Sequence, residues 1–168
     1  MRYLAYIEPP DKVRKSLERL SDEYSFTTPG SGHHITLWGF SIKETREREL
    51  VRRLNSIEHI PSPYEFYSIN PYGKGSLGLT ADDLEGGLRH MHEEVVKNTA
   101  CLDKDKALFN EMYERIGGEN YTPHLTFARE YEGIICVEAF ESVMFKEYKS
   151  RHVKLAKKKN GVWQPVPL

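Results

Sequence analysis

HITL at residues 34–37 and HLTF at residues 124–127 are two copies of one four-residue pattern: histidine, apolar, threonine, apolar. Each copy lies in a segment whose residue types favour a β-strand. Because side chains alternate between the two faces of a strand, the histidine and threonine of each copy share one face and the apolar residues share the other. The sequence therefore predicts two similar strands, each with one face for a core and one that offers an imidazole and a hydroxyl.

The two copies together indicate a specific chemistry. A single copy has an ordinary explanation, a hydrogen-bonded strand histidine beside a good strand former, but a matched pair makes that explanation weaker. Histidine titrates near neutral pH, so His34 and His124 can serve as general base and general acid. The hydroxyls of Thr36 and Thr126 can donate hydrogen bonds to phosphate oxygens. This set suits phosphodiester cleavage without a metal ion, and the strained ring of a 2',3'-cyclic phosphate is a fitting substrate.

The rest of the chain reads as short strands alternating with amphipathic helices. Strands are expected at residues 3–7, 34–40, 64–69, 76–80 and 124–128, with a final pair at 139–148 and 153–157. Helices are expected over 11–20, 43–58, 84–95 and 105–116. Many of the joins resemble hairpins, including a turn at 70–75. An α+β fold built on antiparallel sheet follows.

Length and charge limit the class of protein. The 168 residues are enough for one domain with its own core, here taken as residues 1–168. Formal net charge is -1, which argues against coating long nucleic acid by charge alone. That value is a cancellation: residues 146–159 hold seven basic and one acidic residue (+6), and residues 1–145 hold 17 and 24 (-7). The lysine run at 157–159 in this segment has two interpretations, a solvated turn before Gly161, which is favoured, or a local attractor for RNA phosphates.

Cellular context follows from what the sequence contains. Its two cysteines form no CxxC motif or Cys/His cluster, so we expect reduced thiols and no structural zinc site. Neither a signal peptide nor a membrane-length apolar stretch is recognisable. We therefore expect a cytoplasmic monomer that needs no cofactor.

The paired motifs resemble those of the 2H phosphoesterase superfamily, and most closely the RNA 2',3'-cyclic phosphodiesterases that are often labelled 2'-5' RNA ligases. The resemblance extends over most of the chain. It includes RYLAYIEPPDKVRKSLERL, HHITLWGF, GKGSLGLTADDLEGGLRHMHEEV, YTPHLTFAR and the tail VMFKEYKSRHVKLAKKKNGVWQPV. It implies a bilobal fold with pseudo-twofold symmetry, antiparallel sheets lining a central cleft and helices packed outside. It also implies metal-independent chemistry on RNA ends, centred on the two His-Thr pairs.

Three further residues bear on the site. His33 precedes the first motif, but only His34 has a threonine two places on, so His34 is chosen. Arg129 follows the second motif and is a candidate phosphate-binding residue, although its strand parity is opposite to that of His124 unless the strand bulges. Trp38 has the parity of His34 and Thr36, which makes it the candidate for stacking a base.

Other polar features have simpler interpretations. His90 and His92 are two apart on a helix, which is poor metal geometry, so we expect solvated residues. His59 and His152 are isolated in the sequence. The Gly-Lys-Gly at 73–75 lacks P-loop spacing and is interpreted as a turn.

The functional expectation is hydrolysis of RNA 2',3'-cyclic phosphate ends to a 2'-phosphate, the product being implied by the resemblance alone. Weak 2'-5' ligation would follow if the chemistry runs backwards. The sequence leaves alternatives open: a phosphodiesterase for small cyclic nucleotides or 2'-5' oligonucleotides, or a non-catalytic RNA-end binding module. It does not say which histidine is the acid.

Overall fold

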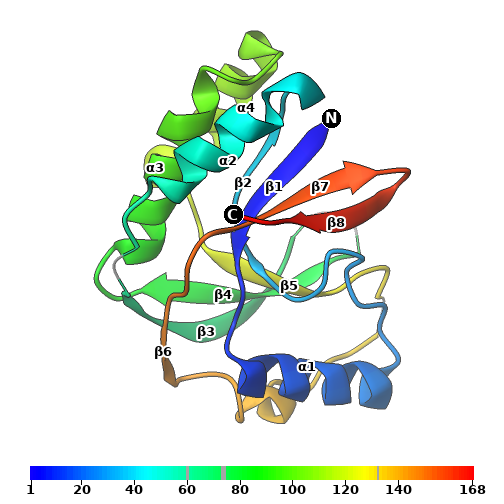
Figure 1. Cartoon of the computed structure of the whole chain (residues 1–168). Helices are drawn as coiled ribbons and strands as arrows, with labels where there is room; N and C mark the ends of the chain where they lie inside the picture. The colour runs from blue at the N-terminus through cyan, green and yellow to red at the C-terminus, as the bar shows by residue number, and fades with distance from the viewer. Residues whose placement is uncertain (60, 73–74, 132) are drawn as a thin grey trace.

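A computed structural model describes residues 1–59, 61–72, 75–131 and 133–168, and the α+β fold expected from the sequence is confirmed (Figure 1). The strands are β1 (Arg2–Ile7), β2 (Ile35–Ser41), β3 (Pro63–Pro71), β4 (Leu77–Asp83), β5 (His124–Ala128), β6 (Glu147–Lys149), β7 (Lys154–Lys159) and β8 (Val162–Val166). The α-helices are α1 (Asp11–Tyr24), α2 (Glu47–Asn55), α3 (Gly87–Ala100) and α4 (Lys106–Ile116), with 3-10 turns η1 (Glu44–Arg46), η2 (Gly118–Asn120) and η3 (Val137–Phe140). Residues 73 and 74 of the expected turn lie outside the described residues.

The eight strands form one antiparallel sheet in the order β6-β3-β4-β5-β2-β1-β7-β8. The sheet has two halves, each containing one motif strand, and β2 and β5 meet where the halves join. They share a single registered pair, Ile35 with Leu125, and both side chains are fully buried. The junction between the halves is thus one apolar pair, flanked on each strand by a histidine and a threonine.

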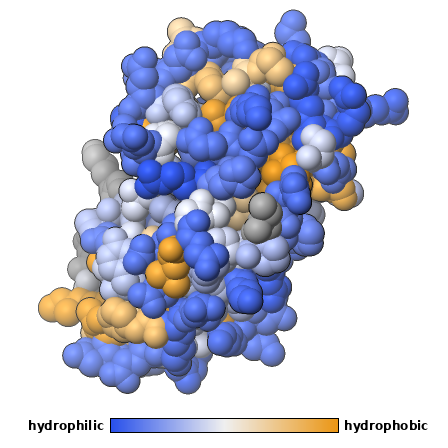
Figure 2. All heavy atoms as spheres, turned by 90° about the vertical axis from the view of Figure 1, so that its left-hand side faces the viewer, coloured by the Kyte–Doolittle hydropathy of each residue, from blue (hydrophilic) through white to orange (hydrophobic). Residues whose placement is uncertain are grey.

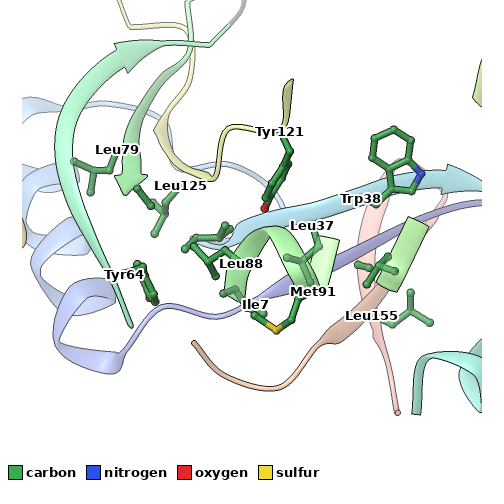
Figure 3. Packing of buried hydrophobic residues seen from close by; sticks show 14 of the residues in the cluster. Ile7, Leu37, Trp38, Tyr64, Leu79, Leu88, Met91, Tyr121, Leu125 and Leu155 are labelled. Atoms are coloured by element: carbon green, nitrogen blue, oxygen red, sulfur yellow. The ribbon is translucent and has the colours of Figure 1, made fainter. Parts of the chain in front are cut away.

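The helices lie on the two halves separately (Figure 1). The first, α1, lies below β3 and β4, and it buries the predicted stripe Val13, Leu17 and Leu20. The other three gather over the half that holds β1 and β2, where α3 packs against β2 and α2 packs against α3. Figure 3 shows the apolar side chains between these layers. From the side, the surface is mostly hydrophilic, with hydrophobic residues exposed in separate patches (Figure 2).

The first motif strand, β2, contains a bulge at the fourth motif position. Tyr6 pairs with Thr36 and Ala5 pairs with Trp38, so Leu37 is an additional residue without a partner in β1. Leu37 and Trp38 are consecutive and both are buried, which strict alternation would not allow on a strand with one open face.

The second motif strand, β5, repeats the same irregularity. Gly78 pairs with Thr126 and Leu77 pairs with Ala128, so Phe127 is the additional residue. Phe127 and Ala128 are again consecutive and both fully buried. The two halves therefore share a backbone distortion at equivalent positions, as the expected pseudo-twofold relation requires.

Two expectations about the elements are wrong. Residues 139–148 do not pair with 153–157, because β6 pairs with β3 while β7 pairs with β1 and β8. The closing hairpin is β7–β8, and its turn is Asn160-Gly161, both with positive φ, a sequence typical of a two-residue hairpin turn. The third helix begins at Gly87 rather than at Leu84, because the Asp83 carboxylate accepts the N–H groups of Leu88 and Arg89.

Candidate active site

The two motif histidines are held in the same way. His34 Nδ1 lies 2.9 Å from the Gly32 carbonyl oxygen, and His124 Nδ1 lies 3.0 Å from the Thr122 carbonyl oxygen. Each partner is two residues upstream of its histidine. Because a carbonyl can only accept, each Nδ1 must carry a proton, which leaves Nε2 as the nitrogen that gains or loses one. Both rings are thus in the tautomer that acid–base work through Nε2 needs.

The two imidazoles are half-buried and close to each other. With Ile35 opposite Leu125 in antiparallel register, His34 lies across the strands from Thr126, and Thr36 lies across from His124. Burial lowers the pKa of His34 below its ordinary value, and the nearby charge of His124 lowers it further. Burial also lowers the pKa of His124. Both rings therefore favour the neutral form more than a solvated histidine does.

An aromatic ring contacts each histidine, but the two contacts differ. Tyr6 meets His34 edge-on, with ring centroids 5.2 Å apart and planes at 62°. Tyr72 stacks face to face on His124 at 3.8 Å and 7°. The Tyr72 hydroxyl is 2.6 Å from Thr80 Oγ1, which fixes the ring on β4.

Two cavities lie near the motif residues. A pocket of about 270 Å³ is lined by Thr36 and His124, with Tyr72, Asn120 and Tyr121 in its walls. A larger cavity, about 710 Å³, is lined by Tyr6 but not by His34 itself. We regard the smaller pocket as the one next to the chemistry, since it contains residues of both motifs.

The two bulges reverse the strand parity expected for Trp38 and for Arg129. Because Trp38 follows the bulge, it takes the parity of Ala5 and faces the helices; it is 2% exposed and packs edge-on against His92, Phe109 and Tyr113. The ring is thus largely enclosed, although Trp38 also lines the pocket that holds Thr36 and His124, and base stacking by Trp38 stays a prediction. The bulge in β5 gives Arg129 the parity of His124, the condition under which it reaches the site. Its backbone bridges to Thr27 and its side chain is exposed.

Sequence reasoning also misjudged three other histidines. His92 is not solvated: it is fully buried, stacked on Tyr121 and bonded to a carbonyl of β2. His59 and His152 are not isolated, since their ring centroids lie 4.2 Å apart and both residues line the larger cavity. No sequence spacing signals these pairs, because each joins residues from distant segments.

Within residues 1–59, 61–72, 75–131 and 133–168, no three His, Cys, Asp or Glu side chains are grouped so that they could hold a metal ion. None of the helices in these ranges has the length and apolarity needed to span a membrane.

The fold defines the class of protein that this chain resembles. No protein-family model matches the sequence, and no curated protein matches it either. Solved structures do match, over nearly the whole chain, and they show that it has the LigT-like 2H phosphoesterase fold.

Three of these structures illustrate the likeness. Escherichia coli LigT complexed with 3'-AMP has a TM-score of 0.67 and is 14% identical, covering 99% of this chain and 94% of that chain. A phosphoesterase has a TM-score of 0.67 and is 15% identical, covering 99% and 95%. TT0787 of Thermus thermophilus has a TM-score of 0.64 and is 16% identical, covering 99% and 94%.

Proposed function

We propose that this chain hydrolyses 2',3'-cyclic phosphates at RNA ends to 2'-phosphates, with His34 and His124 as a general acid–base pair and no metal ion. The observation that carries the proposal is the equivalence of the two half-sites. Each has a histidine whose Nδ1 is fixed by a carbonyl two residues upstream, and each has a strand bulge just after its threonine. Two Nε2 atoms of neighbouring strands are what a double proton transfer needs.

The reaction step balances with these two groups alone. A water molecule attacks phosphorus, and the neutral Nε2 of one histidine takes its proton. The P–O3' bond breaks, and the protonated Nε2 of the other histidine gives its proton to O3'. The products are a 2'-phosphomonoester and a free 3'-hydroxyl, and the two histidines have exchanged protonation states. Proton exchange with solvent restores them.

Phosphate binding falls to the remaining site residues. Thr36 and Thr126 are half-buried hydroxyls beside the histidines, and each can donate a hydrogen bond to a non-bridging oxygen. Charge that develops on these oxygens is best stabilised by donors fixed in advance. The strand parity of Arg129 supports a third role, an ionic contact to the same phosphate.

Nucleotide chemistry is supported by the structures that share the fold. LigT has been solved with 3'-AMP, with phosphate, with NADP+ and with ATP. We extend this to a nucleotide or RNA end as the substrate of this chain. The proposal includes a cytoplasmic monomer, and the free, exposed Cys101 and Cys136 suit a reducing compartment.

The deciding experiment is an assay of a short RNA with a 2',3'-cyclic phosphate end, in EDTA, with the product phosphate located by chromatography. Turnover to a 2'-phosphate that is lost in both His34→Ala and His124→Ala is the expected result. His90→Ala is the control, because that histidine is exposed on α3. Loss of wild-type activity in EDTA would overturn the metal-free mechanism.

The same assay separates the alternatives. Faster turnover of a mononucleoside 2',3'-cyclic phosphate or of a 2'-5' oligonucleotide than of the RNA end would move the substrate class while keeping the site. Tight binding of the RNA end without turnover would indicate a non-catalytic binding module. Incubation of a 5'-hydroxyl RNA with a cyclic-phosphate partner tests for weak 2'-5' ligation.

A further inference from the structure

The first motif strand has backbone carbonyls without a partner in β5 where it diverges from the second motif strand. Beyond Ile35, β2 makes no registered pair with β5 in the described chain, and its bulge removes Leu37 from the ladder with β1. Carbonyl groups in such a segment lose their strand partners, and a buried carbonyl without a partner is costly. Something outside the sheet must therefore hold Thr36 and Leu37.

Two side chains donate hydrogen bonds to these carbonyls. The Tyr121 hydroxyl donates to the Thr36 carbonyl oxygen at 2.9 Å. His92 Nδ1 lies 2.7 Å from the Leu37 carbonyl oxygen and, since a carbonyl only accepts, donates to it. Figure 3 shows Tyr121 with its hydroxyl end directed towards β2. The carbonyls of two consecutive peptide bonds, Thr36–Leu37 and Leu37–Trp38, are thus fixed by side chains.

The two side chains also hold each other. Their rings stack at 4.0 Å between centroids, with planes only 6° apart. His92 is fully buried and Tyr121 nearly so, and the Trp38 ring packs edge-on against the imidazole. The stack joins three elements: α3 supplies the histidine, β2 supplies both acceptors, and the segment before β5 supplies the tyrosine.

The His92 ring is not simply a piece of the core. Its Nε2 is buried without a hydrogen-bond partner among the described residues, and the nearest carboxylate oxygen, from Glu93, is 3.9 Å away. Burial holds the pKa of His92 below its ordinary value, so the ring is neutral and that nitrogen is an unpaired acceptor. An apolar ring would pack there without this penalty, so the Nδ1 bond to Leu37 is the property that favours histidine.

We infer that His92 and Tyr121 are positioning residues that set the place of Thr36, and that they couple the two half-sites. This rests on the proposed function, because Thr36 is assigned there to the phosphate. Tyr121 lies three residues before His124, so its bond to Thr36 ties the approach to the second motif to the first motif strand. Tyr121 lines the smaller pocket and His92 does not, and the role inferred for both is to hold backbone carbonyls of β2.

A double-mutant cycle tests whether the tyrosine acts through Thr36. In the wild-type background, Tyr121→Phe keeps the ring and removes the bond, and kcat/KM for the cyclic-phosphate RNA should fall on the order of tenfold. In the Thr36→Val background, the same change should cost less than about twofold, because the hydroxyl that it positions is already gone. Equal losses in both backgrounds would overturn the inference.

Rescue tests the histidine in the same way. His92→Leu removes the donor to Leu37, while His92→Asn can keep one near the place of Nδ1. We expect His92→Asn to recover most of the activity that His92→Leu loses; equal activity of the two variants would contradict the role. Tyr113→Phe is the matched control, since it removes a hydroxyl that is bonded to Glu93 and keeps the ring that packs against Trp38.

Hydrogen exchange separates failure of this inference from failure of the proposed function. Peptides covering residues 35–40 should exchange faster in Tyr121→Phe and in His92→Leu than in wild type, whatever the substrate is. Their exchange rate should be unchanged in Tyr113→Phe. Unchanged exchange in all three variants would overturn the positioning role even if the enzyme turns over. Faster exchange together with no wild-type turnover would support the stack and overturn the activity.

Discussion

The two half-sites of this molecule are alike in backbone and different in what surrounds it. Both fix Nδ1 of the histidine on a carbonyl two residues upstream, and both have a bulge after the threonine. The aromatic support differs: Tyr6 meets His34 by its edge, whereas Tyr72 lies flat on His124. In the proposed mechanism, the shared backbone gives both histidines a proton-transferring Nε2, and the unequal surroundings set the direction in which each proton moves.

Burial lowers the pKa of both histidines, but the neighbouring groups act differently on the two imidazolium forms. The face of an aromatic ring attracts a cation, so Tyr72 stabilises the imidazolium form of His124. The imidazolium form of His34 is disfavoured, because burial and the charges of His124 and His33 all lower the pKa of His34. The comparison therefore predicts that His34 is the general base and His124 the general acid, a choice that the sequence left open.

The largest expected effect comes from removing either histidine. His34→Ala and His124→Ala should each lower kcat/KM on a cyclic-phosphate RNA by about 10²- to 10⁴-fold, the usual contribution of a positioned acid or base. Steady-state kinetics with matched folding controls measures this. A variant that keeps a tenth of the wild-type rate would break the equivalence of the halves.

The acid and base roles can be told apart by the leaving group. A nitrophenyl phosphodiester expels an oxygen that needs no protonation, so His124→Ala should lose about tenfold less on it than on the cyclic phosphate, while His34→Ala should lose equally on both. The ratio of the two losses is the measurement. The reverse pattern would exchange the two roles.

The threonines should matter less than the histidines and equally in the two halves. Thr36→Val and Thr126→Val remove one hydroxyl donor each with little change of shape, and kcat/KM should fall by about 10- to 10²-fold, at or below the usual cost of one such donor. Thr→Ser at either position keeps the donor and should retain most of the activity. A loss confined to one half would show that the phosphate is held asymmetrically.

The sequence was informative about features that depend on residues close together in the chain. The two motifs, their strands and the α1 stripe follow from alternation and helical spacing, so the pairs His34–Thr36 and His124–Thr126 were predicted together with the fold. The prediction of side-chain direction from strict alternation failed after the threonines. One additional residue in each strand moves every later side chain of that strand to the other face. That single feature made Trp38 look exposed and Arg129 look turned away.

Contacts between segments far apart in the chain could not be predicted from the sequence. His92 sits on a helix face that reads as half polar, and only the packing of α3 on β2 buries it. The stack of Tyr72 on His124 joins the end of β3 to β5, and nothing in either segment signals the other. The closing hairpin is different, because its turn, Asn160-Gly161, is a hairpin signal in the sequence itself and did not need a contact between distant segments to be predicted.

The pH dependence of kcat/KM should reveal the two half-sites as separate limbs. Both histidines have a pKa lowered by burial, so the bell should be centred below about pH 6.5, the ordinary histidine value. Tyr72→Leu removes the ring face that favours the imidazolium of His124, so its pKa should fall further and the alkaline limb should move to lower pH. Tyr6→Leu should leave that limb in place. A bell centred above about pH 7, or an equal shift in both variants, would contradict the assignment.

The smallest expected effect concerns the basic hairpin, which only the first half carries. Lys154 and Lys157 of β7 are already paired, with Glu8 at 2.7 Å and Glu47 at 2.8 Å, so they contribute little free charge. Lys158 lies over the Trp163 ring, and Lys159 is exposed before the turn. Removing both charges, as Lys158→Ala with Lys159→Ala, should lower kcat/KM about twofold for an RNA end at low salt and leave a mononucleoside cyclic phosphate unchanged, because the longer substrate has further phosphates for these charges to attract. The difference should vanish at high ionic strength, where exposed charges are screened. Lys97→Ala on α3 is the control, and an equal loss on both substrates would mean that the hairpin acts on the fold of the first half and not on RNA.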